Sequence, residues 1–258
     1  MKKLLAMLLA LAMLLTLVGA AMAEDSDLAY VQGKGTLVVG ITDFEPMDYK
    51  DADGNWIGYD AELATLFAES LGVTVEFQEI EWDNKILELN GQMIDCVWNG
   101  MTLTDEVTAA MGCTVAYMKN AQVIVMKADK LAEMPDEIDT ADLAGLTFAV
   151  ESGSAGAAAA DELGLTKAEV TSQSAALMEV KSGTSDAAII DLLMAQAMTG
   201  EGTGYADLDY GYELNSEEYG IGFRTGSDLV EKANAFLAEK EADGTLTALA
   251  VKYGLIAE

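Results

Sequence analysis

The sequence predicts an α/β protein of two lobes, each with a mainly parallel sheet flanked by helices. Strand and helix signals alternate from residue 36 to the end of the chain. Such alternation is typical of parallel sheets that are covered by helices. No low-complexity linker separates the two halves, and the prolines stand at Pro46 and Pro135. The pattern therefore favours two α/β lobes that are joined by more than one crossing of the chain.

The first half of this pattern is a β-α-β-α-β series. Apolar residues that alternate with polar ones indicate strands, and apolar residues spaced three and four apart indicate helices. Gly72 is typical of a residue that follows the end of a helix. These signals predict strands over 36–39, 73–77 and 93–98 and helices over 60–71 and 84–89.

The second half repeats the alternation. Thr140 has the residue type that begins a helix, and Leu229, Ala233, Phe236 and Leu237 would share one face of a later one. The signals predict strands over 121–126, 146–150 and 187–190, and helices after Thr140, over 154–163, 175–182, 227–241 and 246–253, and from Leu192.

The first residues have the pattern of an export signal. Lys2 and Lys3 precede an apolar run over 4–18, and Ala21-Met22-Ala23 has the small-x-small form that signal peptidase cuts. We expect a signal peptide at 1–23 and a short linker at 24–32. A retained membrane anchor is the alternative, but the run is shorter than the ~20 residues that a spanning helix needs. No cysteine lies near the cut, so we expect a periplasmic or extracellular protein without a lipid anchor.

The composition excludes several function classes. The formal net charge is −30, from 14 Lys and Arg against 44 Asp and Glu. Nucleic acids are bound by neutralising phosphates, so such a chain is not expected to bind them. Histidine, the usual general base and the commonest metal ligand, is absent. We expect no metal site and no cofactor. Cys96 and Cys113 would either form a disulfide or remain two buried thiols.

A series of short motifs resembles the extracellular solute-binding proteins of family 3, the polar amino-acid-binding proteins of ABC importers. Each motif alone is weak, but their order and spacing cover most of the chain after residue 35. The segments are GTLVVG at 35–40, Pro46, Tyr49, GYD at 58–60, WD at 82–83, ID at 94–95, NGMTLTDE at 99–106, QVIV at 122–125, SGS at 152–154, DAAIID at 186–191, EYGIGF at 218–223 and ADGT at 242–245.

The resemblance implies a periplasmic-binding-protein fold of type II. One lobe would comprise residues 33–117 and 222–258, the other 122–217, with hinges at about 117–121 and 218–221. A small polar or amino-acid-like ligand would be held in the cleft, and the lobes would close on it by a hinge motion. The partners would be that ligand and an ABC permease in the membrane, and we expect a monomer.

Two loops that follow strands are the candidate ligand-binding segments. Asn99, Gly100, Met101 and Thr102 could hold a polar head group through backbone groups and a hydroxyl. Ser152-Gly153-Ser154 follows another strand and opens a helix, where free N–H groups and the positive end of the dipole suit an anion. Simple helix capping by these serines is the alternative.

Four further side chains complete the candidate site. Asp191 ends an apolar strand, where a carboxylate needs a partner, and the family pairs this position with the α-amino group of the ligand. The alternative is a cap of the helix from Leu192. Trp82 lies at the stacking position of the family, and Phe44 would form a second wall, with core packing as the alternative for both. Asp43 could contact a cationic end of the ligand; capping or plain solvation is its alternative.

One departure from the family motif bears on the ligand. The motif continues Thr-x-Thr-x-Glu-Arg, and in the family that arginine binds the α-carboxylate as a bidentate fork. Here Val107 follows Glu106, the next basic residue is Lys119, and Arg224 is the one arginine of the sequence. Either an amino acid binds without that grip, or the ligand lacks a carboxylate.

Transport is the function that these observations favour. A sensor that presents its ligand to a receptor would use the same site and differ only in its partner. A dehydratase on this fold would need acid–base carboxylates, for which Glu151 and Asp191 are the candidates. Without histidine or a clear pair of catalytic carboxylates, we expect a binding protein and not an enzyme.

Overall fold

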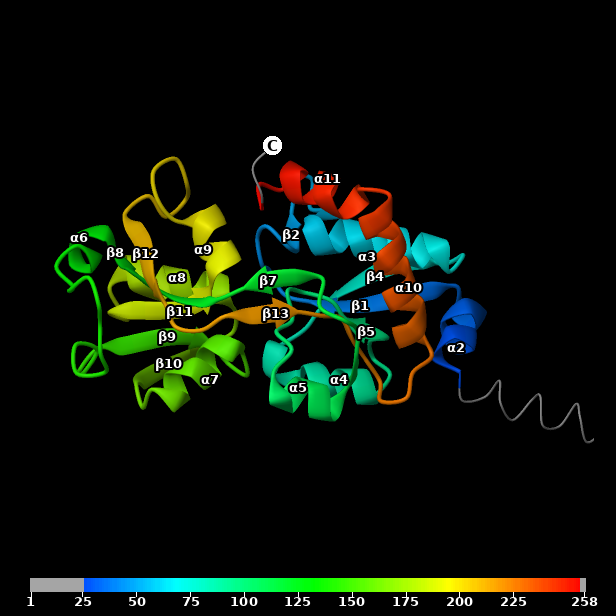
Figure 1. The fold of residues 1–258 in the computed structure, drawn as a ribbon, viewed down its shortest axis with the longest axis horizontal. Coiled ribbons are helices and arrows are strands. Elements are labelled where there is room, and N and C mark those ends of the chain that lie inside the picture. Colours follow the sequence, from blue (N-terminus) through cyan, green and yellow to red (C-terminus); the bar gives the residue numbers. More distant parts are fainter. Residues whose placement is uncertain (1–25, 256–258) are drawn as a thin grey trace, which may run out of the picture.

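In the computed structural model, which describes residues 26–255, two five-stranded sheets lie side by side with helices packed against each (Figure 1). The first sheet has the order β4-β1-β5-β14-β6. Its elements and helices are β1 (Thr36–Ile41), α3 (Tyr59–Ser70), β4 (Thr74–Glu79), η1 (Trp82–Asn84), α4 (Lys85–Asn90), β5 (Cys96–Val97), α5 (Asp105–Ala110), β6 (Gly112–Cys113), β14 (Gly222–Phe223), α10 (Leu229–Ala242) and α11 (Thr245–Lys252). A small hairpin joins β2 (Tyr49–Lys50) to β3 (Trp56–Ile57). We call this part lobe 1.

The second sheet has the order β10-β9-β11-β8-β12, and we call this part lobe 2. Its elements and helices are β8 (Gln122–Lys127), α6 (Ala128–Leu131), β9 (Thr147–Glu151), α7 (Ala155–Glu162), β10 (Thr166–Val170), α8 (Gln173–Ser182), β11 (Ala187–Asp191), α9 (Leu192–Met198) and β12 (Leu208–Glu213). Every residue of β11 is buried, as expected of a central strand that is covered on both faces.

Two short strands connect the lobes. The strands β7 (Met118–Asn120) and β13 (Glu217–Tyr219) pair antiparallel and run side by side from one sheet to the other (Figure 1). The chain therefore crosses twice between the lobes, which confirms the two-lobed α/β fold class. Both sheets are mixed: in each, two neighbouring pairs are parallel and two are antiparallel.

Most predicted elements correspond to observed ones, and apart from short elements that were not predicted, such as β6, α5 and α6, there are three main differences. Residues 140–145 form turns and not the helix expected after Thr140, because Asp139 accepts hydrogen bonds from the backbone N–H groups of Ala141 and Asp142. The strands β10 and β12 were not predicted. Both are edge strands, which do not need the apolar residues that mark a central strand.

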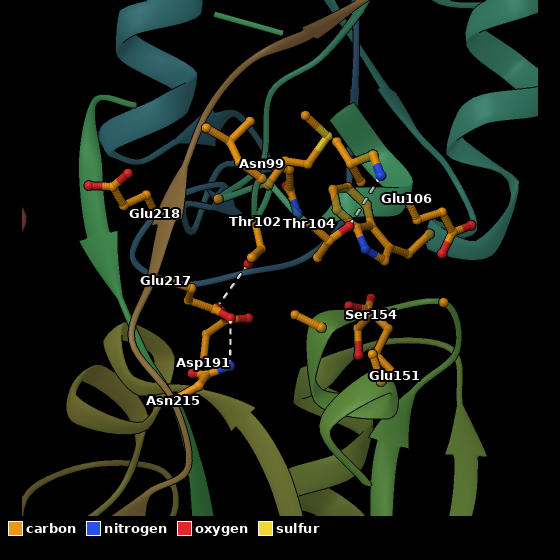
Figure 2. Close-up of a pocket in the computed structure, with 18 of the residues that line it drawn as sticks. Asn99, Thr102, Thr104, Glu106, Glu151, Ser154, Asp191, Asn215, Glu217 and Glu218 are labelled. Carbon is orange, nitrogen blue, oxygen red and sulfur yellow. Dashed lines mark hydrogen bonds between the residues drawn. The ribbon is translucent and has the colours of Figure 1, made fainter. Parts of the chain in front are cut away.

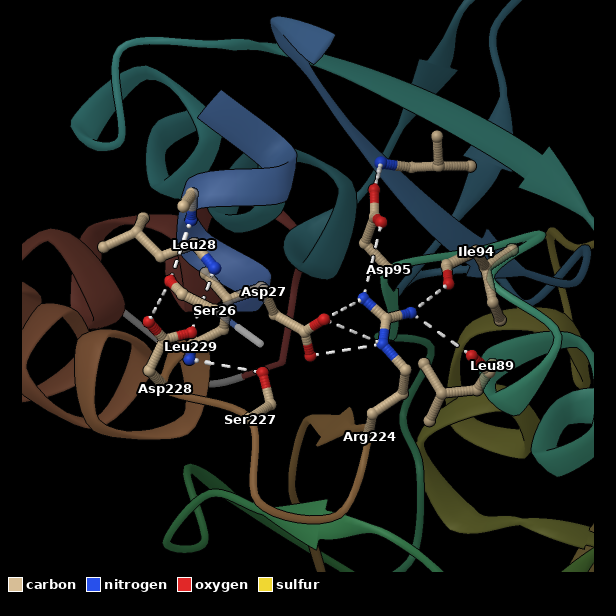
Figure 3. A network of polar contacts seen from close by, with 12 residues as sticks. Ser26, Asp27, Leu28, Leu89, Ile94, Asp95, Arg224, Ser227, Asp228 and Leu229 are labelled. Carbon is tan, nitrogen blue, oxygen red and sulfur yellow. Dashed lines mark hydrogen bonds and ion pairs between the residues drawn. The ribbon is translucent and has the colours of Figure 1, made fainter. Parts of the chain in front are cut away.

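The third difference lies at the start of the described chain. Residues 27–34 of the expected linker form helix α2 (Asp27–Lys34), which Ser26 caps by accepting a hydrogen bond from Ala29 N at 3.0 Å. Arg224 binds Asp27 and fixes α2 to lobe 1 (Figure 3). The expected signal peptide at 1–23 lies outside the described residues.

Two negative findings apply to residues 26–255. No helix in this range is long and apolar enough to cross a membrane. Within the same range, no group of three or more candidate side chains is arranged to hold a metal ion. Cys96 is buried and Cys113 half-buried, and both are free thiols, so the structure agrees with two separate thiols and not with a disulfide.

Candidate functional site

A cavity of about 720 Å³ lies where segments of both lobes meet the connecting strands. Figure 2 shows Asn99, Thr102, Thr104 and Glu106 of lobe 1 across from groups of lobe 2. The lining residues are, from lobe 1, Trp82, Lys85 and 99–107; from lobe 2, Glu151, 153–155, Ala158, Glu162, Gln173 and Asp191; and from β7, β13 and the segment before β13, Lys119 and 215–218.

Most of the predicted site residues come together here. Those that line the cavity are Trp82, Asn99, Gly100, Met101, Thr102, Ser154 and Asp191. Phe44 does not: it is 2% exposed and packs edge-on against the Tyr219 ring, with centroids 6.4 Å apart, so the core alternative holds. Asp43 is exposed outside the cavity wall. Ser152 also lies outside, and its backbone N–H donates to Val170 O at 2.9 Å.

The loop that begins at Asn99 is fixed from behind. The Asn99 side chain accepts from Thr42 N at 2.9 Å and donates to Thr42 Oγ1 at 2.8 Å, so it joins the ends of β1 and β5. Gly100 has a φ of 56°, and its N–H donates to Asp60 Oδ2 at 2.7 Å. A side chain at this position would be strained and would also meet the Phe44 ring at 2.5 Å. The loop is therefore pre-formed before any ligand arrives.

The acidic end of the cavity is built around Asp191. Its side chain makes no capping bond to α9, so the capping alternative is wrong. Asp191 is 5% exposed, and its carboxylate accepts hydrogen bonds from the side chains of Asn120, Gln122, Gln173 and Tyr219. Burial, and after it the charge of Glu217, raises the pKa of Asp191 to about 8.

Glu217 was missed by the sequence analysis. Its Oε1 accepts from Thr102 Oγ1 at 2.9 Å, from Asn120 Nδ2 at 2.6 Å and from Gln122 Nε2 at 2.8 Å, and Figure 2 shows it between Thr102 and Asp191. It therefore ties lobe 1 to lobe 2 through polar contacts. Glu217 directly precedes the hinge expected at 218–221, and this position is the signal in the sequence that could have pointed to it.

Lys85 was also missed, although it stands three residues after Trp82, a spacing that places two side chains on one helical face. It is 6% exposed, and its Nζ lies 4.9 Å from the centroid of the Trp82 ring. Nζ donates to Trp82 O at 3.2 Å and, across the lobes, to Gly153 O at 2.9 Å. Burial lowers the pKa of Lys85, and the charges of Glu106, Glu151 and Asp83 oppose that shift.

The lobe 2 wall opposite Lys85 begins α7. Ser154 Oγ accepts a hydrogen bond from Ala157 N at 3.1 Å, so this serine caps the helix, which was the alternative to ligand binding. Glu151 is 3% exposed, and its Oε1 has no hydrogen-bond partner among the described residues. Burial, followed by the charge of Asp191, raises the pKa of Glu151 to about 8.

Val107 stands where the family motif has arginine, and the structure gives this position to apolar packing. It is 4% exposed and belongs to a cluster with Trp82, Met101 and Met111. The lining carries more acidic than basic side chains. The acidic ones are Asp105, Glu106, Glu151, Glu162, Asp191, Glu217 and Glu218, and the basic ones are Lys85 and Lys119.

Comparisons with known proteins agree over most of the chain. A family model described as bacterial extracellular solute-binding proteins, family 3, matches residues 37–256. The arginine-binding extracellular protein ArtP of Bacillus subtilis is 32% identical over 231 residues, 86% of this chain and 87% of ArtP. The L-cystine-binding protein TcyA of the same organism is 30% identical over 236 residues, 90% of this chain and 86% of TcyA.

Solved structures give the same result. A mutant of ArgBP from T. maritima superposes with a TM-score of 0.81 at 30% identity, covering 89% of this chain and all of the other. A cyclohexadienyl dehydratase of Pseudomonas aeruginosa matches less of the chain: 25% identity over 146 residues, 56% of this chain and 54% of the dehydratase.

Proposed function

Because the chain belongs to the bacterial extracellular solute-binding proteins of family 3, we propose that it captures an amino acid between its lobes and delivers it to an ABC permease. It is a solute-binding protein and not an enzyme, since the relatives matched over most of its length are binding proteins. The observation that carries the proposal is the cavity itself, which both lobes line and the connecting strands border.

The ligand that fits best is an amino acid with a positive charge. Acidic groups predominate in the lining, and Asp191 and Glu217 stand together at one end without a basic side chain in salt-bridge contact among the described residues. A buried carboxylate such as that of Asp191 favours a cationic partner. The names of ArtP and TcyA point to arginine and cystine as ligands of similar proteins. L-Arginine is therefore our first candidate.

The remaining assignments belong to the same proposal. Residues 33–117 with 222–258 and residues 122–217 would move as the two lobes about β7 and β13. Asp191 and Trp82 would contact the ligand, with Met101 and Thr102 beside them. The family is extracellular, and we propose that residues 1–23 are removed on export, leaving a monomer without a lipid anchor.

A ligand screen on residues 24–258 tests this function. We expect L-arginine or another cationic amino acid to raise the thermal midpoint, because a ligand at 100 times its Kd adds about 2.7 kcal/mol to the free energy of unfolding. Calorimetry should then give one site per chain. The proposal fails if neither the standard amino acids nor L-cystine shifts the midpoint, or if a stabilising amino acid is turned over. A receptor in place of a permease would appear as binding to a different membrane partner.

A further inference from the structure

The cavity contains one buried basic side chain. Of the two lysines in its lining, Lys119 is exposed on β7, whereas Lys85 is 6% exposed. A cation in this position is costly unless a partner compensates for its lost hydration. The acidic character of the rest of the lining makes this lysine the exception that needs an explanation.

The hydrogen-bond partners of Lys85 are neutral groups. Its Nζ donates to two carbonyl oxygens, of Trp82 and of Gly153, and an ammonium has three hydrogens to donate. None of the salt bridges among residues 26–255 includes Lys85. The carboxylates of Glu106, Glu151 and Asp83 act on Lys85 without direct contact, so one donor of its ammonium group remains for a group in the cavity.

A second source of positive potential lies next to Lys85. The Gly153 carbonyl that it contacts is two residues before α7, an eight-residue helix whose N-cap Ser154 and first residue Ala155 line the cavity. The Ala157 N–H of this turn donates to Ser154 Oγ, but the N–H groups before it in the turn lack intrahelical acceptors, and the turn carries the positive end of the helix dipole. Lobe 1 supplies the ammonium and lobe 2 the helix start, so the two meet at the same part of the wall.

We propose that Lys85 and the first turn of α7 bind the α-carboxylate of the ligand, in place of the arginine that Val107 replaces. This inference rests on the proposed capture of an amino acid. The carboxylate would contact both lobes at Lys85 and Ser154, while the ammonium group of the ligand lies toward Asp191 and Glu217. A ligand that contacts both lobes stabilises their closed arrangement, and here the carboxylate does so at one end of the cavity.

The proposal predicts that the protein prefers an amino acid to the amine formed by its decarboxylation. The acidic lining alone would give the reverse preference. Without Lys85, seven acidic side chains would favour a decarboxylated amine over the parent amino acid, because the amine has more net positive charge. With Lys85, the amino acid is preferred. Lys85 is then a specificity-determining residue, and its removal should affect the two ligands differently.

The test compares paired ligands on three variants. Calorimetry measures L-arginine against agmatine and L-histidine against histamine, on the wild type, Lys85→Met and Lys85→Gln. Losing a hydrogen bond to a charged group should weaken binding of the amino acid about 10- to 100-fold, with less than about a 3-fold change for the amine. Lys85→Gln retains a donor for Gly153 O without the charge, and serves if Lys85→Met does not fold. Lys240→Met is the matched control, because Lys240 also lies over an aromatic ring, at 5.7 Å from Phe236, but outside the cavity.

Each outcome decides the matter. If folded Lys85→Met and Lys85→Gln bind the amino acid as tightly as the wild type, the inference is wrong and the proposed function stands. An equal loss for amino acid and amine, with an unchanged thermal midpoint, also overturns it, since Lys85 would then shape the cavity without reading the carboxylate. If the wild type binds no amino acid at all, the proposed function fails first and the inference fails with it.

Discussion

The molecule contains two buried groups of ionisable side chains. In one group the charges pair with charges of opposite sign, and in the other the side chains contact neutral groups. At the base of lobe 1, Arg224 binds Asp27 through Nε at 2.9 Å and Nη2 at 2.7 Å, while Nη1 donates to Leu89 O and Ile94 O (Figure 3). Asp95, with no exposed side-chain surface, pairs with Lys34 at 2.6 Å and lies 3.7 Å from Arg224. Arg224, Asp27, Asp95 and Lys34 each have a charged partner of opposite sign.

The cavity between the lobes lacks such pairing. Lys85 contacts carbonyl oxygens only, and Asp191 is held by amide groups and the Tyr219 hydroxyl. Charges that are paired inside the protein contribute to the fold, whereas ionisable groups held by neutral dipoles remain available to pair with a charged ligand. The comparison separates residues of similar burial into those that stabilise the protein and those that are proposed to bind the solute.

The largest expected effect comes from removing the arginine. Arg224→Met leaves Asp27 without its charged partner and Asp95 with Lys34 alone, and breaking a buried ion pair costs about 3–5 kcal/mol of unfolding free energy. Guanidinium unfolding of the ligand-free protein measures this loss. The variant should bind the amino acid within about 3-fold of the wild-type Kd at a temperature where it is folded, because Arg224 lies outside the cavity lining.

Lys240→Met is the control for this experiment, since Lys240 forms only exposed pairs with Glu239 and Asp243 and should leave the midpoint unchanged. A large loss of affinity in Arg224→Met, or a stability equal to that of the control, would break the distinction between the two regions.

The second prediction concerns pH. The pKa of Asp191 is about 8 in the free protein, so below pH 8 its carboxyl holds a proton that a bound ammonium group must displace. Affinity should therefore rise from pH 6 to pH 8, by at most about tenfold per pH unit, and then level off. Calorimetry in two buffers of different ionisation enthalpy would detect the released proton.

Two variants identify the group that releases this proton. Asp191→Asn should weaken binding and remove the pH slope. Glu151→Gln should keep the slope, because the Glu151 carboxyl interacts with Lys85 at the other end of the cavity and would not contact the ammonium group of the ligand. A slope that persists in Asp191→Asn would show that another group releases the proton.

The sequence was sufficient for the fold and for part of the site. Periodicity and the spacing of motifs identified the main elements of both sheets, and a strand followed by a loop placed Thr102 and Asp191 at the cavity. Phe44 was misplaced because an aromatic residue at a strand end looks the same whether it lines a cavity or supports a loop from behind. Only the close approach of its ring to Gly100 decides between them.

The missed residues depend on contacts between the lobes. Lys85 and Glu217 acquire their roles from groups far away in the sequence, Gly153 and Thr102. Local spacing could place Lys85 beside Trp82 and Glu217 beside the expected hinge, but it contains no information on these contacts between the lobes. The absence of arginine at Val107 was visible in the sequence, but the lysine that compensates for it is on a different helix and becomes apparent only when the two lobes are placed together.

The smallest expected effect is on the stability of Lys85→Met without ligand, and it is the most direct test of the comparison. An unpaired buried cation gives up hydration without a charged partner, and a methionine of similar length would pack against Trp82 and the apolar cluster around Val107. The carbonyl groups of Trp82 and Gly153 would lose their hydrogen bonds to Lys85, but they border an open cavity, where water can reach them. We therefore expect the unfolding free energy to change by less than about 1 kcal/mol, or to increase, against the several kcal/mol lost in Arg224→Met.

Guanidinium unfolding of both variants side by side measures the contrast. A loss in Lys85→Met as large as that in Arg224→Met would place Lys85 among the residues that maintain the fold, and the neutrality of its partners would no longer mark a charge reserved for the ligand.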